Sequence, residues 1–413
     1  MTAAGSNVLQ GPLAMRVFVA FASGYFLSYA LRSVNAVIAT DLIDEFGLSN
    51  AQLGSLSSAY FFAFAALQMP LGVWLDRFGS RRVDASLLLI AACGCAVFAL
   101  AHSVTLLWVG RALIGIGVSG ALMASLRAFR FWYAPARQQQ LAAWMLVAGT
   151  LGALVTTVPV QLALPAIGWR GVFWVAAVLL GAASAAIFLQ LPGEPGHAVQ
   201  RDASPWSGYL QVYGERYFWR FGLVSLTVQS SFIAFQGLWI GPWMRRVLGM
   251  DAASAAQALF AFNLVLMLGY VALGWAVPGL VRRGWTTLRL VAIGTALMLV
   301  LELAIAFAHG SWAWVLWLAL AAAATVHTLA QTHVSLSFPE RLTGRAFSAY
   351  NLLAMGGMFL AQWLFGVTVD ALGGSGERGA DAFRHAMLVW VAVQALALMV
   401  LVFWRVQPPK ATT

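Results

Sequence analysis

The sequence predicts an all-α membrane protein with twelve transmembrane helices in two six-helix, pseudo-symmetric halves. Of its 413 residues, 61% are hydrophobic and only 9% are charged, whereas soluble domains average about 25% charged residues. The apolar residues form long runs near the ~20 residues that cross a bilayer core. A set of residues in the first half recurs at the same spacing in the second half. Together these observations exclude an ordinary soluble domain.

Twelve stretches have the length and apolar character of a membrane span. They are 16–38, 52–75, 84–104, 106–131, 138–162, 170–190, 219–243, 255–280, 286–308, 312–336, 345–370 and 384–405. An even number of spans places both termini on one side of the membrane. Basic residues are much more frequent in the loops on that side, so we expect both termini to be cytoplasmic in an inner membrane.

The chain divides into two halves around a polar linker. We expect a cytoplasmic tail at 1–15, a first half at 16–190, a cytoplasmic linker at 191–218, a second half at 219–405 and a tail at 406–413. The repeated residues follow the fourth and the tenth span. They are Pro135, Arg137, Ala142 and Gly152 in the first half and Pro339, Arg341, Ala346 and Gly356 in the second.

A short charged turn lies between the second and third spans. It contains, in order, Gly72, Asp76, Arg77, Gly79, Arg81 and Arg82. Ionised side chains cost about 3 kcal/mol or more each in hydrocarbon, so this segment must lie at the membrane face. Its pattern, G-x-x-x-D-R-x-G-x-R-R, resembles the loop signature of the major facilitator superfamily. The resemblance implies an inner gate in which Asp76 and the arginines pair across the two halves; the alternative is a basic anchor that only orients the helices.

The fourth span carries a second part of this resemblance. Arg111 begins an R-x-x-x-G-x-G pattern with Gly115 and Gly117, similar to the fourth helix of facilitators. The glycines allow close helix packing, and the arginine needs a polar partner or a water-filled cavity. A structural role and a part in proton coupling both remain open for Arg111. The family further implies a substrate site near the midplane, between two six-helix halves.

The first span offers a candidate anion site. Tyr25, Tyr29 and Arg32 recur at i, i+4 and i+7 and so share one helical face. A guanidinium beside two phenols suits a carboxylate or phosphate, which it binds with paired hydrogen bonds. The surrounding pattern resembles the first helix of facilitators that carry organic anions. The alternative is that Arg32 extends to the outer surface.

Further candidate substrate contacts lie on the fourth, seventh and tenth spans, which surround the pathway in facilitators. They are Arg127 near the cytoplasmic end of the fourth, Gln229, Gln236 and Trp239 on one predicted face of the seventh, and His327 and Gln331 on the tenth. Arg127 has the alternative of extending to the surface, and His327 that of a buried structural histidine. Gln236 stands where organic phosphate exchangers carry an arginine, which disfavours a dianionic phosphate.

Proton coupling is assigned to Glu302 or His327, with Arg111 modulating them. Glu302 is the only acid expected well inside a span, and an intramembrane carboxyl indicates function by default. Because the ninth helix is peripheral in this fold, structural pairing of Glu302 is the alternative.

The predicted function is therefore secondary active transport of a small organic anion, a carboxylate or amino-acid-like solute, by alternating access and proton-coupled uptake. Efflux of drugs or amphiphiles and a non-transporting sensor are the alternatives; the fifth span lacks the Gly-Pro run of drug antiporters. The sequence shows no nucleophile–base pair, metal spacing or nucleotide loop, so we expect no enzyme, cofactor or metal. The expected partners are the substrate, protons and the lipid bilayer, with no nucleic acid, and the chain is expected to be a monomer.

Overall fold

The computed structural model describes residues 9, 11–134, 137–192, 205–373 and 379–409. Within these ranges the regular structure is entirely helical, as the sequence predicts. The chain forms two units. Unit 1 comprises Met1–Asp41 and Ala59–Gln200, and unit 2 comprises Leu42–Ser58 and Arg201–Thr413. The predicted linker residues 193–204 and parts of both predicted tails lie outside the described residues.

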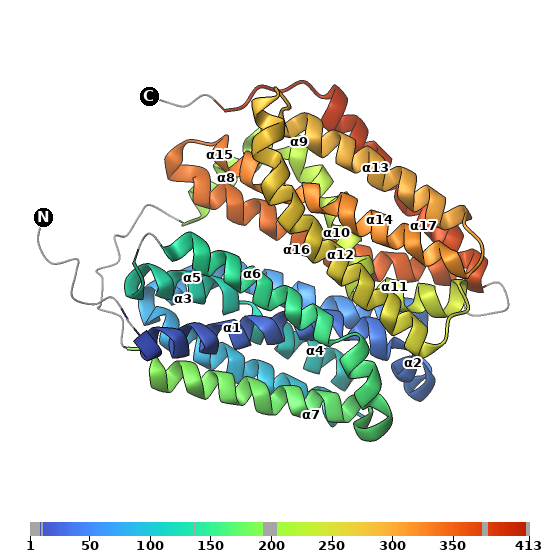
Figure 1. Ribbon diagram of the computed structural model, residues 1–413, viewed down its shortest axis with the longest axis horizontal. Helices are drawn as coiled ribbons and strands as arrows, with labels where there is room; N and C mark the ends of the chain where they lie inside the picture. The colour runs from blue at the N-terminus through green and yellow to red at the C-terminus, as the bar shows by residue number, and fades with distance from the viewer. Residues whose placement is uncertain (1–8, 10, 135–136, 193–204, 374–378, 410–413) are drawn as a thin grey trace, which may run out of the picture. The chain divides into compact units, whose positions relative to one another are not determined.

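Seven helices make up the first part of the chain. They are α1 (Gly11–Ser33), α2 (Asn35–Phe46), α3 (Asn50–Ala99), α4 (Val104–Val118), α5 (Ala121–Trp132), α6 (Gln138–Val155) and α7 (Val158–Gln190). In unit 1, α1 packs along α6 and α7 (Figure 1). The end of α2 and the first residues of α3 belong to unit 2, which includes Leu42–Ser58.

The charged turn between the second and third predicted spans is not a separate loop. Helix α3 runs through it and departs from helical geometry only at Gly79, with φ 76° and ψ 163°. This left-handed conformation favours glycine because it has no Cβ. Two predicted spans are therefore joined at a single residue, and Gly168 joins two helical segments within α7 in the same way.

The remaining helices belong to unit 2. They are α8 (Pro205–Gly214), α9 (Arg216–Val224), α10 (Ser230–Ala234), α11 (Ile240–Pro242), α12 (Ala252–Arg282), α13 (Thr287–Phe307), α14 (Trp314–Ala324), α15 (Thr328–Leu336), α16 (Glu340–Ala371) and α17 (Gly379–Phe403). Helices α9 to α11 form one continuous helix. It is interrupted by π-helical turns at Ser225–Gln229, Phe235–Trp239 and Trp243–Val247.

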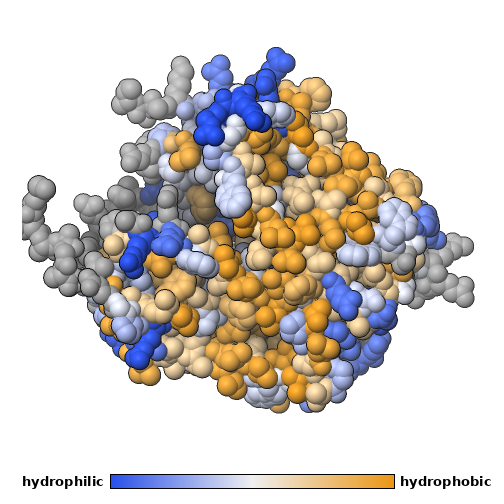
Figure 2. Space-filling view, viewed as in Figure 1, coloured by the Kyte–Doolittle hydropathy of each residue, from blue (hydrophilic) through white to orange (hydrophobic). Residues whose placement is uncertain are grey.

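Ten helices in the described part of the chain are long and apolar enough to cross a membrane. The predicted count of twelve differs because the first part of α3 is not counted separately and α6 is a shorter apolar helix. Large apolar side chains cover the outside of these helices; Trp275, Leu189 and Phe403 are more than three-quarters exposed. The visible face in Figure 2 is accordingly mostly hydrophobic. Such a surface is stable in lipid and would be unusual in water.

Candidate functional site

Arg32 lies in the last turn of α1 inside an aromatic surround. The residue is 9% exposed, and its Cζ atom lies 4.5 Å from the ring centroid of Tyr29 and 5.7 Å from that of Phe61. The Tyr25 and Tyr29 rings pack edge to face at 5.0 Å. The face predicted from the i, i+4, i+7 spacing therefore forms one cluster, and Arg32 is enclosed by protein.

Arg111 lies on α4 and is fully buried. Its Nη1 atom donates to the carbonyl oxygen of Leu31 at 2.9 Å, one of the last carbonyls of α1, which have no partner within the helix. Tyr60 of α3 lies beside this guanidinium, with 5.6 Å from the Arg111 Cζ atom to its ring centroid. The Tyr60 hydroxyl donates to the Ser28 carbonyl oxygen at 3.2 Å. These contacts join α1, α3 and α4 around two arginines.

The two arginines keep unsatisfied hydrogen-bond donors. Arg32 Nε, Arg111 Nε and Arg111 Nη2 are buried and have no acceptor among the described residues, and neither side chain forms an ion pair with a described carboxylate. The Asn35 side-chain amide, at the start of α2, is also buried without a partner there. Buried polar groups are normally hydrogen-bonded. We name Arg32, Arg111, Tyr60 and Asn35 the guanidinium cluster.

Two glycines allow this cluster to form. A Cβ atom on Gly115 of α4 would lie 2.2 Å from the Tyr60 carbonyl oxygen, and one on Gly149 of α6 would lie 2.8 Å from Tyr25 Cε1. Close approach of α4 to α3 and of α6 to α1 therefore requires residues without side chains at these two positions. The R-x-x-x-G-x-G pattern predicted the first contact. Neither Tyr60 nor Gly149 carried a sequence signal that separated it from its neighbours.

The acid of the charged turn pairs within unit 1. Asp76 forms an ion pair with Arg127 of α5, with side-chain exposures of 57% and 24%. The Asp76 carboxylate and the Arg127 guanidinium thus engage each other within unit 1. The predicted pairing of the charged turn across the two halves stays a prediction.

The other members of the turn face outward or toward aromatic rings. The Arg81 Cζ atom lies 4.6 Å from the ring centroid of Phe188 on α7, and the Arg77 Cζ atom lies 5.2 Å from that of Phe78. Arg82 is exposed, and Gly72 has no neighbour where a Cβ would lie. These contacts attach the turn to α7 as well as to α5.

Two side chains that were predicted on one face of the seventh span contact different helices. Gln236 donates to Asn263 Oδ1 of α12 at 2.8 Å, and Trp239 donates to the Gln362 carbonyl oxygen of α16 at 3.2 Å. Trp239 is fully buried, whereas Gln236 is half-buried. Both residues lie in the π-helical turn Phe235–Trp239, and their common face on the transport pathway stays a prediction. Gln229 lies in the first such turn, where its Oε1 accepts from the Ser225 hydroxyl at 3.4 Å.

His327 is buried with both ring nitrogens occupied. Nε2 lies 3.0 Å from the Thr295 hydroxyl and Nδ1 lies 3.3 Å from the Ala324 carbonyl oxygen. The Thr295 hydroxyl donates its proton to the Val291 carbonyl oxygen at 2.8 Å, so the neutral imidazole either donates from Nε2 to Thr295 Oγ1 or from Nδ1 to the Ala324 carbonyl oxygen, according to its tautomer. The geometry favours the structural alternative for this residue. Gln331, one turn further on α15, is half-buried.

Two carboxyl groups are fully buried in the helices. Glu302 of α13 accepts from Gln394 Nε2 of α17 at 2.7 Å, and its other oxygen has no donor among the described residues. Asp84 of α3 has no hydrogen-bond partner there for either oxygen. Asp84 lies at the edge of the third predicted span and is a second fully buried carboxyl group, which the sequence analysis did not single out.

A cluster that the sequence did not indicate lies at the start of α3, within unit 2. The Asp370 carboxylate of α16 accepts from the backbone N–H of Ala51 at 2.7 Å and from the Asn50 side-chain amide at 2.7 Å. Arg246 donates to Asn50 Oδ1 at 3.0 Å. A carboxylate at a helix N-terminus satisfies free N–H groups and interacts favourably with the helix dipole. We name Asn50, Arg246 and Asp370 the α3 cap.

Comparisons with known proteins agree with this geometry. The family model described as Major Facilitator Superfamily matches residues 21–361. The chain is 36% identical over 162 residues to a "Probable sulfoacetate transporter SauU" of Cupriavidus necator, covering 39% of this chain and 36% of that protein. It is 26% identical over 301 residues to the hexuronate transporter of Escherichia coli K12, covering 67% of this chain and 69% of that one.

A solved structure shows the same fold. It is a bacterial homologue of the human lysosomal transporter Spinster in an inward-facing, unoccupied conformation. The TM-score is 0.77 at 19% sequence identity, with 97% of this chain and 100% of that chain covered. At this identity the likeness concerns the fold alone. The match to SauU spans only about a third of that protein's length.

Proposed function

Because this chain belongs to the Major Facilitator Superfamily and is a membrane transporter, we propose that it carries a small organic anion bound by the guanidinium cluster. The observation that carries the proposal is the set of unsatisfied donors on Arg32 and Arg111. A buried cation without a counter-charge costs several kcal/mol in a membrane. A carboxylate or sulfonate that enters the site removes this cost by accepting those hydrogen bonds.

The chemistry of the relatives supports the same class of substrate. Sulfoacetate and hexuronates are small anions whose charge sits on a sulfonate or a carboxylate, and transporters named for them share sequence with this chain. The Tyr25 and Tyr29 phenols add donors next to Arg32 without neutralising its charge. We therefore expect a carboxylate or sulfonate group on a small polar body.

The finer parts of the proposal follow from the sequence. The protein is placed in the inner membrane as a monomer with both termini in the cytoplasm. Transport is uptake by alternating access, driven by the proton gradient. The charged turn, held to α5 by the Asp76–Arg127 pair, is assigned the inner gate.

The test is ligand-induced stabilisation of the purified protein. Melting temperatures are measured in detergent with sulfoacetate, glucuronate or galacturonate and with glucose as the uncharged control. We expect an anion to raise the melting temperature of the wild type and glucose to leave it unchanged. Arg32→Ala should weaken anion affinity about thirtyfold or more, because truncating one partner of a buried charged pair costs ~2–5 kcal/mol.

Two further variants sharpen this test. Arg32→Lys keeps the charge but loses the planar two-pronged contact, so we expect most of the affinity to be lost. Arg283→Gln removes an exposed arginine at the end of α12 and should bind as the wild type does. If Arg32→Ala binds the stabilising anion like the wild type, the organic-anion proposal fails and a cationic or lipid-like substrate becomes the better hypothesis.

A further inference from the structure

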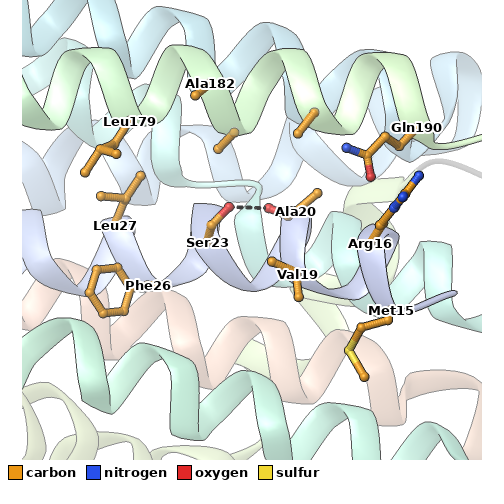
Figure 3. A pocket seen from close by; sticks show the side chains of 12 residues that line it. Met15, Arg16, Val19, Ala20, Ser23, Phe26, Leu27, Leu179, Ala182 and Gln190 are labelled. Atoms are coloured by element: carbon orange, nitrogen blue, oxygen red, sulfur yellow. Dashed lines mark hydrogen bonds between the residues drawn. The ribbon is translucent and has the colours of Figure 1, made fainter. Parts of the chain in front are cut away.

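A groove between α1 and α7 of unit 1 has a polar end and an apolar body. Its volume is about 520 Å³. Along its length it is lined by small and apolar side chains, among them Val19, Ala183 and Ala186. Figure 3 shows Arg16 and Gln190 together at one end, at the start of α1 and the end of α7. The groove is separate from the guanidinium cluster, whose arginines do not line it.

The body of the groove offers nothing to a polar ligand. Its hydroxyl group, on Ser23, already donates to the Ala20 carbonyl oxygen at 2.8 Å (Figure 3). The remaining lining there consists of alanine, valine, leucine and phenylalanine side chains. In a membrane, an alkyl chain is stabilised on such a surface by the dispersion attraction of closely packed atoms. The small alanine side chains of α7 permit this close packing. The body therefore fits an acyl chain.

The polar end offers one cation and one acceptor. Arg16 is exposed and contributes an always-charged guanidinium. The Gln190 Oε1 atom is buried and has no donor among the described residues. No acidic side chain lines the groove, so the end carries positive charge. It matches a headgroup that combines a phosphodiester with a hydroxyl donor.

We propose that this groove is a binding site for an anionic phospholipid with a hydroxylated headgroup, of the phosphatidylglycerol class. Arg16 binds the phosphodiester, a headgroup hydroxyl donates to Gln190 Oε1, and one acyl chain lies along α1 and α7. In the proposed orientation, with the N-terminus inside, the headgroup lies at the cytoplasmic leaflet, where basic residues between helices attract anionic lipids. The lipid would act as a wedge between the two helices and stabilise their packing.

The test measures lipid retention by native mass spectrometry. The protein is purified in detergent and incubated with dioleoyl phosphatidylglycerol or dioleoyl phosphatidylcholine. We expect preferential retention of phosphatidylglycerol and a higher melting temperature with it. Arg16→Gln should lower phosphatidylglycerol retention about fivefold, since one basic residue near anionic lipid is worth about 1 kcal/mol.

Two other variants separate the headgroup from the acyl chain. Ala186→Leu fills the body of the groove and should reduce retention although Arg16 is intact. Arg283→Gln removes an exposed arginine from a distant helix and should retain lipid like the wild type. Melting temperatures in lipid-free detergent check that each variant folds, and Arg16→Lys, which keeps the charge, should retain most of the binding.

Several results would overturn the assignment. Equal retention of both lipids by the wild type would reduce the groove to ordinary lipid contact. Unchanged retention in both Arg16→Gln and Ala186→Leu would place the lipid elsewhere. Displacement of the lipid by inorganic phosphate alone would show a simple anion site. Because the measurement uses lipid and no transport substrate, its failure would leave the organic-anion proposal standing.

Discussion

Arg32 and Arg111 show how a membrane protein retains two guanidinium groups in its interior. Each is enclosed by aromatic rings, whose negative faces attract cations by about 0.5–2 kcal/mol. Arg111 also binds a helix-end carbonyl, while Arg32 relies on the phenols around it. These contacts reduce the cost of burial but leave donors unsatisfied. These donors are the ones that the proposed organic anion would accept.

Gly149 provides a test of this site that leaves its charges unchanged. In Gly149→Ala the new methyl group would meet the Tyr25 and Tyr29 rings at 2.8 and 3.0 Å. Both rings must move, so we expect anion affinity to fall about tenfold. The free energy of unfolding should also fall by about 1–3 kcal/mol. Thermal melting with and without the anion separates the two effects.

Gly181→Ala is the matched control, because nothing lies within 4 Å of the added methyl group on α7. It should bind and melt like the wild type. Unaltered anion affinity in folded Gly149→Ala protein would mean that the tyrosines take no part in binding.

At the scale of helices, charged side chains compensate helix ends inside the membrane protein. Arg111 binds a carbonyl at the end of α1, and Arg384 donates to the Ala306 and Ala308 carbonyl oxygens at the end of α13. Asp370 does the opposite at the start of α3. These contacts satisfy backbone groups at helix ends that have no partner within their own helix. The α3 cap therefore specifies where the first turns of α3 pack in unit 2.

Backbone contacts reinforce this packing. A Cβ atom on Gly54 would lie 2.4 Å from the Gln362 carbonyl oxygen, and one on Gly366 would lie 2.3 Å from the Asn50 carbonyl oxygen. Helices α3 and α16 thus meet through glycines with backbone against backbone.

Asp370→Asn should loosen the start of α3. The amide keeps one acceptor oxygen but loses the charge, so we expect about 1–2 kcal/mol of local stability to be lost. Hydrogen exchange at residues 50–58 should then rise about tenfold, while exchange in α6 stays unchanged. Asp381→Asn, at an exposed carboxylate in the first turn of α17, is the control. Equal protection of residues 50–58 in both variants would exclude a role for the α3 cap.

The whole molecule combines an apolar exterior with a few enclosed polar groups, and those groups bear on the energy source for transport. Of the two predicted proton carriers, His327 has both ring nitrogens engaged. Glu302 keeps one carboxyl oxygen without a donor and faces the amide of Gln394. Burying a charged carboxylate costs much more free energy than burying a neutral carboxyl group. Binding or release of a proton at Glu302 would therefore strongly change the free energy of its surroundings.

Proton coupling therefore has a direct test in proteoliposomes. We expect accumulation of the anion under an imposed pH gradient and its loss when a proton ionophore collapses the gradient. Glu302→Gln, which mimics the neutral carboxyl, should abolish accumulation but retain downhill exchange. His327→Gln serves as the comparison and should affect stability more than coupling. Accumulation that is indifferent to ionophore would refute proton coupling, and full accumulation by Glu302→Gln would return this residue to a structural role.

The sequence by itself determined the membrane class, the helical fold and the family. These follow from properties that each segment carries alone: apolar length, sparse charge and a charged turn that cannot enter hydrocarbon. The same local logic placed Tyr25, Tyr29 and Arg32 on one face, because a regular helix such as α1 has about 3.6 residues per turn.

The tertiary structure alone decided what each polar group meets. In the helix from Arg216 to Val247, the spacing of Gln236 and Trp239 did not indicate that one contacts α12 and the other α16. Tyr60 between two arginines, Asp76 bound to Arg127 and Asp370 at the start of α3 all join segments distant in sequence. Such pairings depend on which helices become neighbours. A side chain's type states what it can bind, but only packing brings its partner within hydrogen-bonding distance.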